Sequence, residues 1–135
     1  MKDLTLEAAA ENIPAVTAFI DGELEALDCP IKAQMQIDVA IDELFGNIAH
    51  YAYGEGRGDA TVRFAFDEAA RTVSVTFMDR GAPFDPLKAA DPDVNAPALE
   101  RDIGGLGIFL VKKTMDGMDY RYENGQNILT IYKKI

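Results

Sequence analysis

The chain has 135 residues, of which 48% are hydrophobic, enough for one domain with a buried core. Its formal net charge of −10 argues against a nucleic-acid partner, whose phosphates would be repelled, and suits docking on a basic protein. The single cysteine, Cys29, excludes an internal disulfide framework and fits a reducing compartment. We expect its side chain to be a small buried hydrophobe rather than a nucleophile.

Neither a membrane span nor a signal peptide is expected from this sequence. No stretch approaches the roughly 18 consecutive apolar residues of a membrane span. The charged first residues are not followed by the apolar run of a signal peptide. We therefore expect a soluble, cytoplasmic protein without a membrane partner.

The first third of the chain predicts one short strand and two helices. Residues 4–8 alternate in polarity, which is typical of a strand. Asn12 suits the N-cap of a helix that runs to about residue 27. Pro30 ends that helix and precedes a second one, at about 32–53.

The middle of the chain predicts a hairpin followed by a long loop. Apolar residues alternate over 60–66 and 72–78, and the turn at 67–71 makes the two strands antiparallel. Between Asp79 and Asp102, repeated Pro, Asp and Asn residues prevent a long helix or strand. A loop of this length in a compact domain is usually a functional lid or a disordered segment.

The last third predicts a helix and a second hairpin. The helix, at about 108–115, is opened by the glycine-rich run at 104–107. The closing strands, at 119–123 and 127–132, flank an Asn-Gly pair, the strongest short hairpin signal. The order of elements predicts an α+β two-layer sandwich, in which three helices lie on one face of a mixed, mainly antiparallel sheet. One domain covers the whole chain.

The second helix carries the first candidate for chemistry. At about 100° per residue, Glu43, Asn47 and His50 fall on one polar stripe. A carboxylate there could take a proton from an attacking hydroxyl or water, and a carboxamide oxygen suits Mg²⁺. Gly46 costs about 1 kcal/mol relative to Ala, which indicates that something approaches the backbone there. The alternative is a solvated polar face, with His50 a helix-packing residue. The neighbouring stripe is an apolar seam formed by Ile37, Ile41, Leu44, Ile48 and Tyr51.

Two further stretches could cooperate with this helix. Asp79, at a strand end two residues before Gly81, can accept a hydrogen bond from a buried donor while backbone passes close by. Gly105 and Gly107 let backbone N–H groups converge at a helix N-terminus, which favours phosphate. Alone, the first is explained by a strand-ending turn and the second by an ordinary glycine before a helix. The glycine spacing matches neither a P-loop nor a GxGxxG dinucleotide site.

Together, the three stretches resemble a known set of motifs. Glu43-x-x-x-Asn47, Asp79-x-Gly81-x-Pro83-Phe84-Asp85-Pro86 and Gly105-x-Gly107 resemble, in order and spacing, the N, G1 and G2 boxes of the GHKL ATPase superfamily. Within it, the chain looks most like the stand-alone anti-sigma factor serine/threonine kinases. That similarity lies in the residues 47–53, 104–111, 115–116 and 120–122, and the resemblance extends over essentially the whole chain.

The resemblance implies a Bergerat-type ATP-binding fold with an ATP lid at about 85–104. By position, it makes Glu43 the general base toward the acceptor hydroxyl and Asn47 the Mg²⁺ ligand. Asp79 would bind the adenine amino group, and Gly81 would leave room for the base.

The remaining site residues also follow from the resemblance. The glycine-rich helix start, Gly105, Leu106 and Gly107, would hold the phosphates. Thr130 matches a position that often places a hydroxyl near adenine. Arg101, the only arginine of the lid, could reach the terminal phosphate, as phosphoryl transfer depends on charge neutralisation. A plain surface arginine is the alternative.

The function implied is an ATP- and Mg²⁺-dependent kinase that phosphorylates a Ser or Thr on an anti-anti-sigma factor of the STAS type. The same protein would sequester a sigma factor, and a homodimer is compatible with its helix faces. With no phosphoacceptor-histidine hairpin before the domain, a complete sensor histidine kinase is not expected. One alternative is a nucleotide-dependent partner-switching module with little or no kinase activity, which would not need Glu43. The other is an ATP hydrolase.

Overall fold

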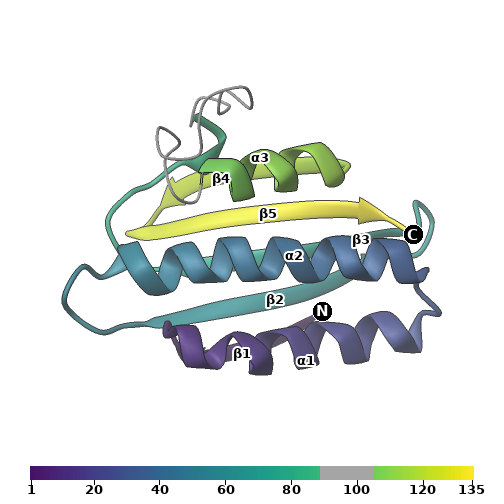
Figure 1. Ribbon diagram of the computed structural model, residues 1–135, viewed down its shortest axis with the longest axis horizontal. Coiled ribbons are helices and arrows are strands. Elements are labelled where there is room, and N and C mark those ends of the chain that lie inside the picture. The colour runs from purple at the N-terminus through teal and green to yellow at the C-terminus, as the bar shows by residue number, and fades with distance from the viewer. Residues whose placement is uncertain (89–104) are drawn as a thin grey trace.

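Three helices cover one face of a five-stranded sheet, as Figure 1 shows. The computed structural model describes residues 1–88 and 105–135. The helices are α1 (Ile13–Ala26), α2 (Ile31–Asn47) and α3 (Gly105–Thr114). The strands are β1 (Lys2–Glu7), β2 (Asp59–Asp67), β3 (Thr72–Asp79), β4 (Gly117–Glu123) and β5 (Gln126–Lys134). This confirms the predicted α+β class with all three helices on one face.

The sheet has the strand order β1-β2-β3-β5-β4. All four neighbouring pairs are antiparallel, so no parallel pair occurs among the described strands, where a mixed sheet was expected. The last strand, β5, lies between β3 and β4 and pairs Asn127 with Asp79. Because β5 runs antiparallel to β3, the end of β3 at Asp79 lies beside the start of β5 at Asn127.

The core lies between the helices and the inner face of the sheet. On each central strand every second residue is buried, such as Val75 and Phe77 on β3 and Leu129 and Ile131 on β5. Burial at these alternating positions is what the period of two in a strand requires. The helices contribute the residues at helical spacing: Val16, Ile20 and Leu24 on α1 and Ile37, Ile41, Leu44 and Phe45 on α2.

The second helix does not run as one α-helix to Tyr53, as predicted. It ends as α2 at Asn47 and continues as a wider π-helical turn, Ile48–Ala52. The change of helical period moves Tyr51 out of the apolar seam, and its side chain is exposed. Two residues after this turn, Gly54 has a positive φ of 56°. Short π-helical segments are frequent at functional sites.

Cys29 is buried, as expected, and burial raises the pKa of its thiol. Asn12 does precede α1, but its side chain donates to the Glu7 carbonyl (2.9 Å) and makes no cap hydrogen bond to the helix. In the part of the chain that the structure describes, no helix combines the length and the apolar character needed to cross a membrane.

Candidate functional site

The carboxylate of Glu43 lies directly against the start of α3. A Cβ added at Gly107 would overlap the Glu43 carboxylate, so this position accepts only a glycine unless Glu43 moves. Glu43 is half-buried in the last part of α2, and Gly107 is the third residue of α3. The structure thus brings together the two stretches that the sequence predicted to act as proton acceptor and phosphate cradle.

Asn47 is the last residue of α2, one helical turn after Glu43. Its side chain is half-buried, and it stands where the α-helix changes into the π-helical turn. Four residues apart on a helix, the two side chains lie on the same face. His50, the third member of the predicted stripe, is exposed within the π-helical turn, so nothing in its surroundings assigns it a catalytic role.

Two hydrogen bonds and one close packing contact hold the end of the π-helical turn against the end of β3. The Ala82 N–H donates to the Ala52 carbonyl (3.0 Å), and the Arg80 N–H donates to the Tyr53 hydroxyl (2.9 Å). A Cβ on Gly81 would overlap the Ala52 backbone. Gly81 is therefore required for packing of one backbone segment on another.

Asp79 ends β3 on the helix-covered face and is buried there. Its Oδ1 accepts hydrogen bonds from the Gly81 N–H (2.9 Å) and from the Asn127 amide (3.0 Å). Its other oxygen, Oδ2, accepts none from the described residues. A buried carboxylate with one oxygen fixed and one available is suited to bind a donor such as an exocyclic amino group.

Asn127 is a residue of this site that the sequence reasoning missed. It is buried on β5 beside Asp79, and its amide also donates to the Ala82 carbonyl (3.0 Å). Its Oδ1 accepts from the Phe84 N–H (3.1 Å) and from the Tyr120 hydroxyl. Burial raises the pKa of Tyr120, so this hydroxyl remains protonated and keeps donating. One amide therefore fixes the Asp79 carboxylate and the loop segment that follows β3.

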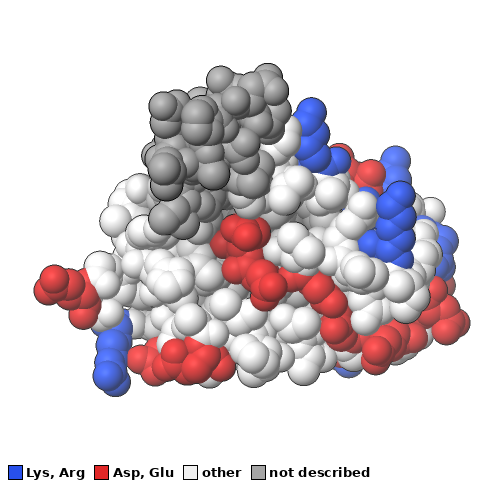
Figure 2. Space-filling model, in the orientation of Figure 1, with Lys and Arg blue, Asp and Glu red and all other residues white. Residues whose placement is uncertain are grey.

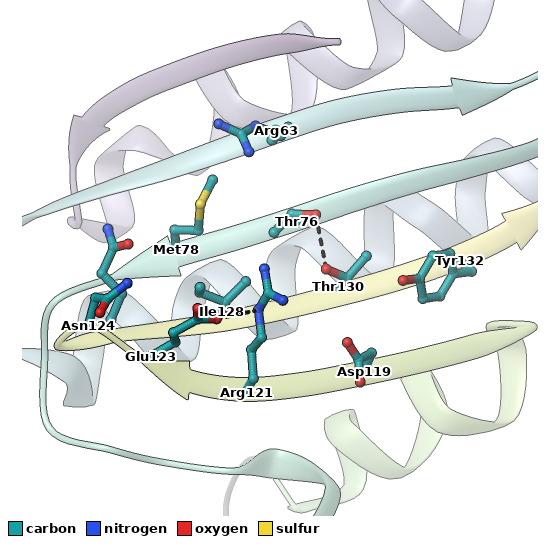
Figure 3. A pocket seen from close by; sticks show the side chains of 11 residues that line it. Arg63, Thr76, Met78, Asp119, Arg121, Glu123, Asn124, Ile128, Thr130 and Tyr132 are labelled. Atoms are coloured by element: carbon teal, nitrogen blue, oxygen red, sulfur yellow. Dashed lines mark hydrogen bonds and ion pairs between the residues drawn. The ribbon is translucent and has the colours of Figure 1, made fainter.

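Thr130 does not join this group. On β5 it alternates with the buried Leu129 and Ile131, so it points to the sheet face opposite the helices. Its hydroxyl is hydrogen-bonded to that of Thr76 (3.0 Å), and Figure 3 shows both among the residues lining a hollow of about 480 Å³ on that face. The expectation that Thr130 lies near the adenine site was wrong, because alternate residues of a strand point to opposite faces and Thr130 is on the other face from Asp79. Asn127 lies beside Asp79 instead.

The glycines at 46 and 105 and the predicted lid have different outcomes. Gly46 has no close neighbour among the described residues, since an added Cβ would meet only Ile13 Cδ1 at 4.0 Å, which is ordinary contact. No described residue therefore makes the close approach expected at its backbone. Gly105 begins α3, so the glycine-rich run does form a helix N-terminus. Arg101 and most of the predicted lid, residues 89–104, lie outside the described residues.

The arrangement fits a nucleotide with a divalent cation. Asp79 supplies a buried acceptor, and the start of α3 supplies backbone N–H groups and a positive dipole end. Within residues 1–88 and 105–135, no cluster of three or more His, Cys, Asp or Glu side chains could hold a metal alone. Mg²⁺ often takes only one or two protein ligands and completes its shell with water and phosphate, so a single oxygen from Asn47 is compatible with it.

Comparisons with known proteins identify the family of the chain. A family model described as the histidine kinase-like ATPase domain matches residues 6–133. The chain is 28% identical over 129 residues to the serine/threonine-protein kinase BtrW of Bordetella bronchiseptica, covering 94% of this chain and 90% of that protein. It is 25% identical over 131 residues to the serine-protein kinase RsbW of Bacillus cereus, covering 94% and 81%.

Among solved structures, the fold is similar to that of the histidine kinase AdeS of Acinetobacter baumannii, with 11% identity and a TM-score of 0.49. The match covers 99% of this chain and 68% of that one. The family model, in contrast, spans nearly the whole sequence and agrees with the resemblance carried by the three boxes. The chain therefore belongs to the family of histidine kinase-like ATPase domains.

Proposed function

We propose that the chain is an ATP- and Mg²⁺-dependent kinase that phosphorylates a serine or threonine on an anti-anti-sigma protein of the STAS type. The enzyme class follows from the relatives: BtrW is named a serine/threonine-protein kinase and RsbW a serine-protein kinase. The ATPase domain implies that ATP is bound. The STAS substrate and the requirement for Mg²⁺ are the parts of this proposal that go beyond the relatives and the family.

The observation that carries the proposal is the contact between Glu43 and Gly107. A carboxylate held at the N-terminal end of a helix stands beside the place where phosphates bind best. There it can accept the proton of an acceptor hydroxyl as that oxygen attacks the terminal phosphate. Phosphoryl transfer needs mainly such positioning and charge stabilisation.

The other residues orient the nucleotide. Asp79, fixed by Asn127 and by the Gly81 N–H, would accept a hydrogen bond from the adenine amino group through its available oxygen. Gly105, Leu106 and Gly107 would direct backbone N–H groups at the phosphates. Mg²⁺, when bound, supplies charge neutralisation between phosphate oxygens, and Asn47 would hold it. Arg101 is a candidate for the terminal phosphate.

The same protein would hold a sigma factor while its antagonist is phosphorylated, and so regulate transcription in the cytoplasm. A net charge of −10 supports docking of a basic partner over direct binding of nucleic acid. A homodimer would be compatible with this role.

The experiment is transfer of labelled γ-phosphate to purified candidate STAS proteins encoded near this chain. We expect one candidate to be labelled on Ser or Thr, in a reaction that stops when EDTA removes the divalent cation. Nucleotide binding without transfer to any candidate would instead support a partner-switching module without kinase activity. Release of free phosphate alone would indicate an ATP hydrolase.

A further inference from the structure

The outer face of α2 carries a row of exposed apolar side chains. Ile31, Met35 and Val39 are 69%, 62% and 48% exposed, and they follow one another at intervals of four residues. That spacing aligns them along one side of the helix over roughly 12 Å. Single exposed hydrophobic residues are normal, but a row on one helix face is a recognised docking feature. We call these three residues the α2 ridge.

Leu110 of α3 extends this apolar surface. It is 45% exposed and comes three residues after Gly107, so it lies on the side of α3 that faces α2. The α2 ridge and Leu110 therefore place exposed apolar side chains on two helices that pack against each other, α2 and α3.

The flank of the ridge toward α1 is acidic. Asp38 and Asp42 belong to α2, and Asp21 and Glu25 belong to α1. The other three lie near Asp38: burial raises the pKa of Asp38 to about 7, and the neighbouring Asp21, Asp42 and Glu25 add to this rise. Figure 2 shows acidic side chains running as a stripe across this helical face.

These carboxylates lack cationic partners within the described chain. None of the four forms an ion pair with a described lysine or arginine. One buried oxygen each of Asp21 and Asp38 has no hydrogen-bond partner. Like charges held together in this way raise the free energy of the unbound surface, and a cation brought by a partner would relieve it.

We propose that the α2 ridge and its acidic flank are a docking surface for a basic amphipathic helix of a partner protein. Apolar side chains of that helix would cover Met35, Val39 and Leu110, and its Lys or Arg residues would pair with Asp38 and Asp42. The charge disfavours the other occupants. A second copy would bring a net charge of −10 toward another −10, and anionic lipid or nucleic acid would be repelled.

The position links this surface to the candidate active site. Val39 precedes Glu43 by one turn, about 6 Å along the helix axis. A helix docked on the ridge would lie next to the end of α2 that carries the proposed general base. A role for this docking beside the proposed general base rests on the proposed kinase function, whereas the docking itself does not.

The test measures peptide binding to the full chain without nucleotide, by fluorescence anisotropy. The probe is a labelled 18-residue amphipathic peptide of leucine and lysine, and the controls are its scrambled form and a leucine–glutamate version. We expect the Leu/Lys peptide to bind and the controls to bind at least tenfold more weakly. Met35→Ser with Val39→Ser, and separately Glu25→Gln with Asp42→Asn, should each weaken binding at least tenfold. Tyr132→Ser, an exposed aromatic on the far face of the sheet, should change it less than twofold.

Equal binding by the ridge variants, the acidic variants and the unmodified chain would overturn the proposal. So would ridge variants that abolish a dimer in sedimentation without affecting peptide binding, because the occupant would then be a second copy. Loss of binding to anionic vesicles in the same variants would assign the surface to a membrane instead. As no ATP is present, failure of the kinase proposal leaves these outcomes unchanged.

Discussion

The carboxylate of Glu43 and the Cα of Gly107 are so close that no Cβ fits between them. The two residues are far apart in the sequence and come from α2 and α3, whose packing creates the contact. The carboxylate is the far end of a flexible side chain, so a larger residue at 107 would displace it and leave the backbone in place. A substitution at 107 therefore tests the proposed role of the Glu43 carboxylate.

Gly107→Ala should therefore lower the rate of phosphoryl transfer at least tenfold while changing the free energy of unfolding by less than about 1 kcal/mol. The reason is that the new methyl group moves the Glu43 carboxylate away from the acceptor. Single-turnover transfer and urea unfolding would measure the two effects. In a Glu43→Ala background the same substitution should cause no further loss of transfer, and an additional tenfold loss there would show that Gly107 acts through something else.

Asn127→Ala should weaken nucleotide binding and cost about 1–3 kcal/mol of stability, since it removes hydrogen bonds from buried and partly buried polar groups. The Ala82 carbonyl and the Phe84 N–H would lose the bonds they make to this amide, and the Asp79 carboxylate would keep only the Gly81 N–H. Calorimetry with ATP and thermal unfolding are the measurements. Thr130→Val is the matched control on the same strand, and nucleotide affinity that falls for Thr130→Val but not for Asn127→Ala would reverse the two assignments.

Gly81→Ala should destabilise the protein by about 1–3 kcal/mol, because its methyl group would meet the rigid backbone of Ala52. Gly22→Ala is the control, since nothing lies within 4 Å of a Cβ added there, on α1. A helical glycine with free space should gain roughly 0.5–1 kcal/mol on substitution by alanine. Denaturant unfolding that shows equal effects for the two variants would contradict the described packing.

Asp38 should make stability depend on pH. Its pKa is raised from 3.8 to about 7 by burial and by Asp21, so the folded state retains a proton that the unfolded chain loses at lower pH. The retained proton adds to the free energy of unfolding in full below about pH 4. This added stability is lost as pH rises toward 7, above which stability levels off. Because the carboxyl group is partly exposed, we expect on the order of 1 kcal/mol.

Asp38→Asn should remove this decline and stabilise the protein at pH 8, as measured by urea unfolding from pH 5 to 8. Asp42→Asn, one turn away and exposed, should leave most of the decline in place. A decline of the same size in Asp38→Asn would mean that another group is responsible.

The sequence predicted the helices and strands, because these follow local periodicity. Glu43, Asn47 and Asp79 were proposed from spacing and from the resemblance, and the structure places Glu43 against Gly107 and Asp79 beside Asn127. The choice of Thr130 failed on long-range pairing, since which residue of β5 faces Asp79 depends on strand register. A signal for Asn127 was present: it shares the alternation of Leu129 and Ile131, so a polar side chain at 127 lies on the face of β5 that carries these two apolar residues.

The change from α-helix to π-helical turn after Asn47 also could not be predicted from the local sequence. Apolar periodicity continued through Tyr51, but the end of the π-helical turn and the residue after it accept hydrogen bonds from Ala82 and Arg80, which follow β3. Similarly, Gly46 looked functional because glycine is costly in a helix, whereas Gly81 is the glycine that the described packing requires. Tertiary contacts decided both cases.

The most direct test of the account compares ATP binding and phosphate transfer in Glu43→Ala and the unmodified chain, with a STAS protein that the unmodified chain phosphorylates. We predict ATP affinity within about threefold of the unmodified chain and transfer reduced by at least about 10²-fold, as expected for loss of a general base. Undiminished transfer by Glu43→Ala would contradict the central claim that the carboxylate held against Gly107 accepts the proton of the attacking hydroxyl.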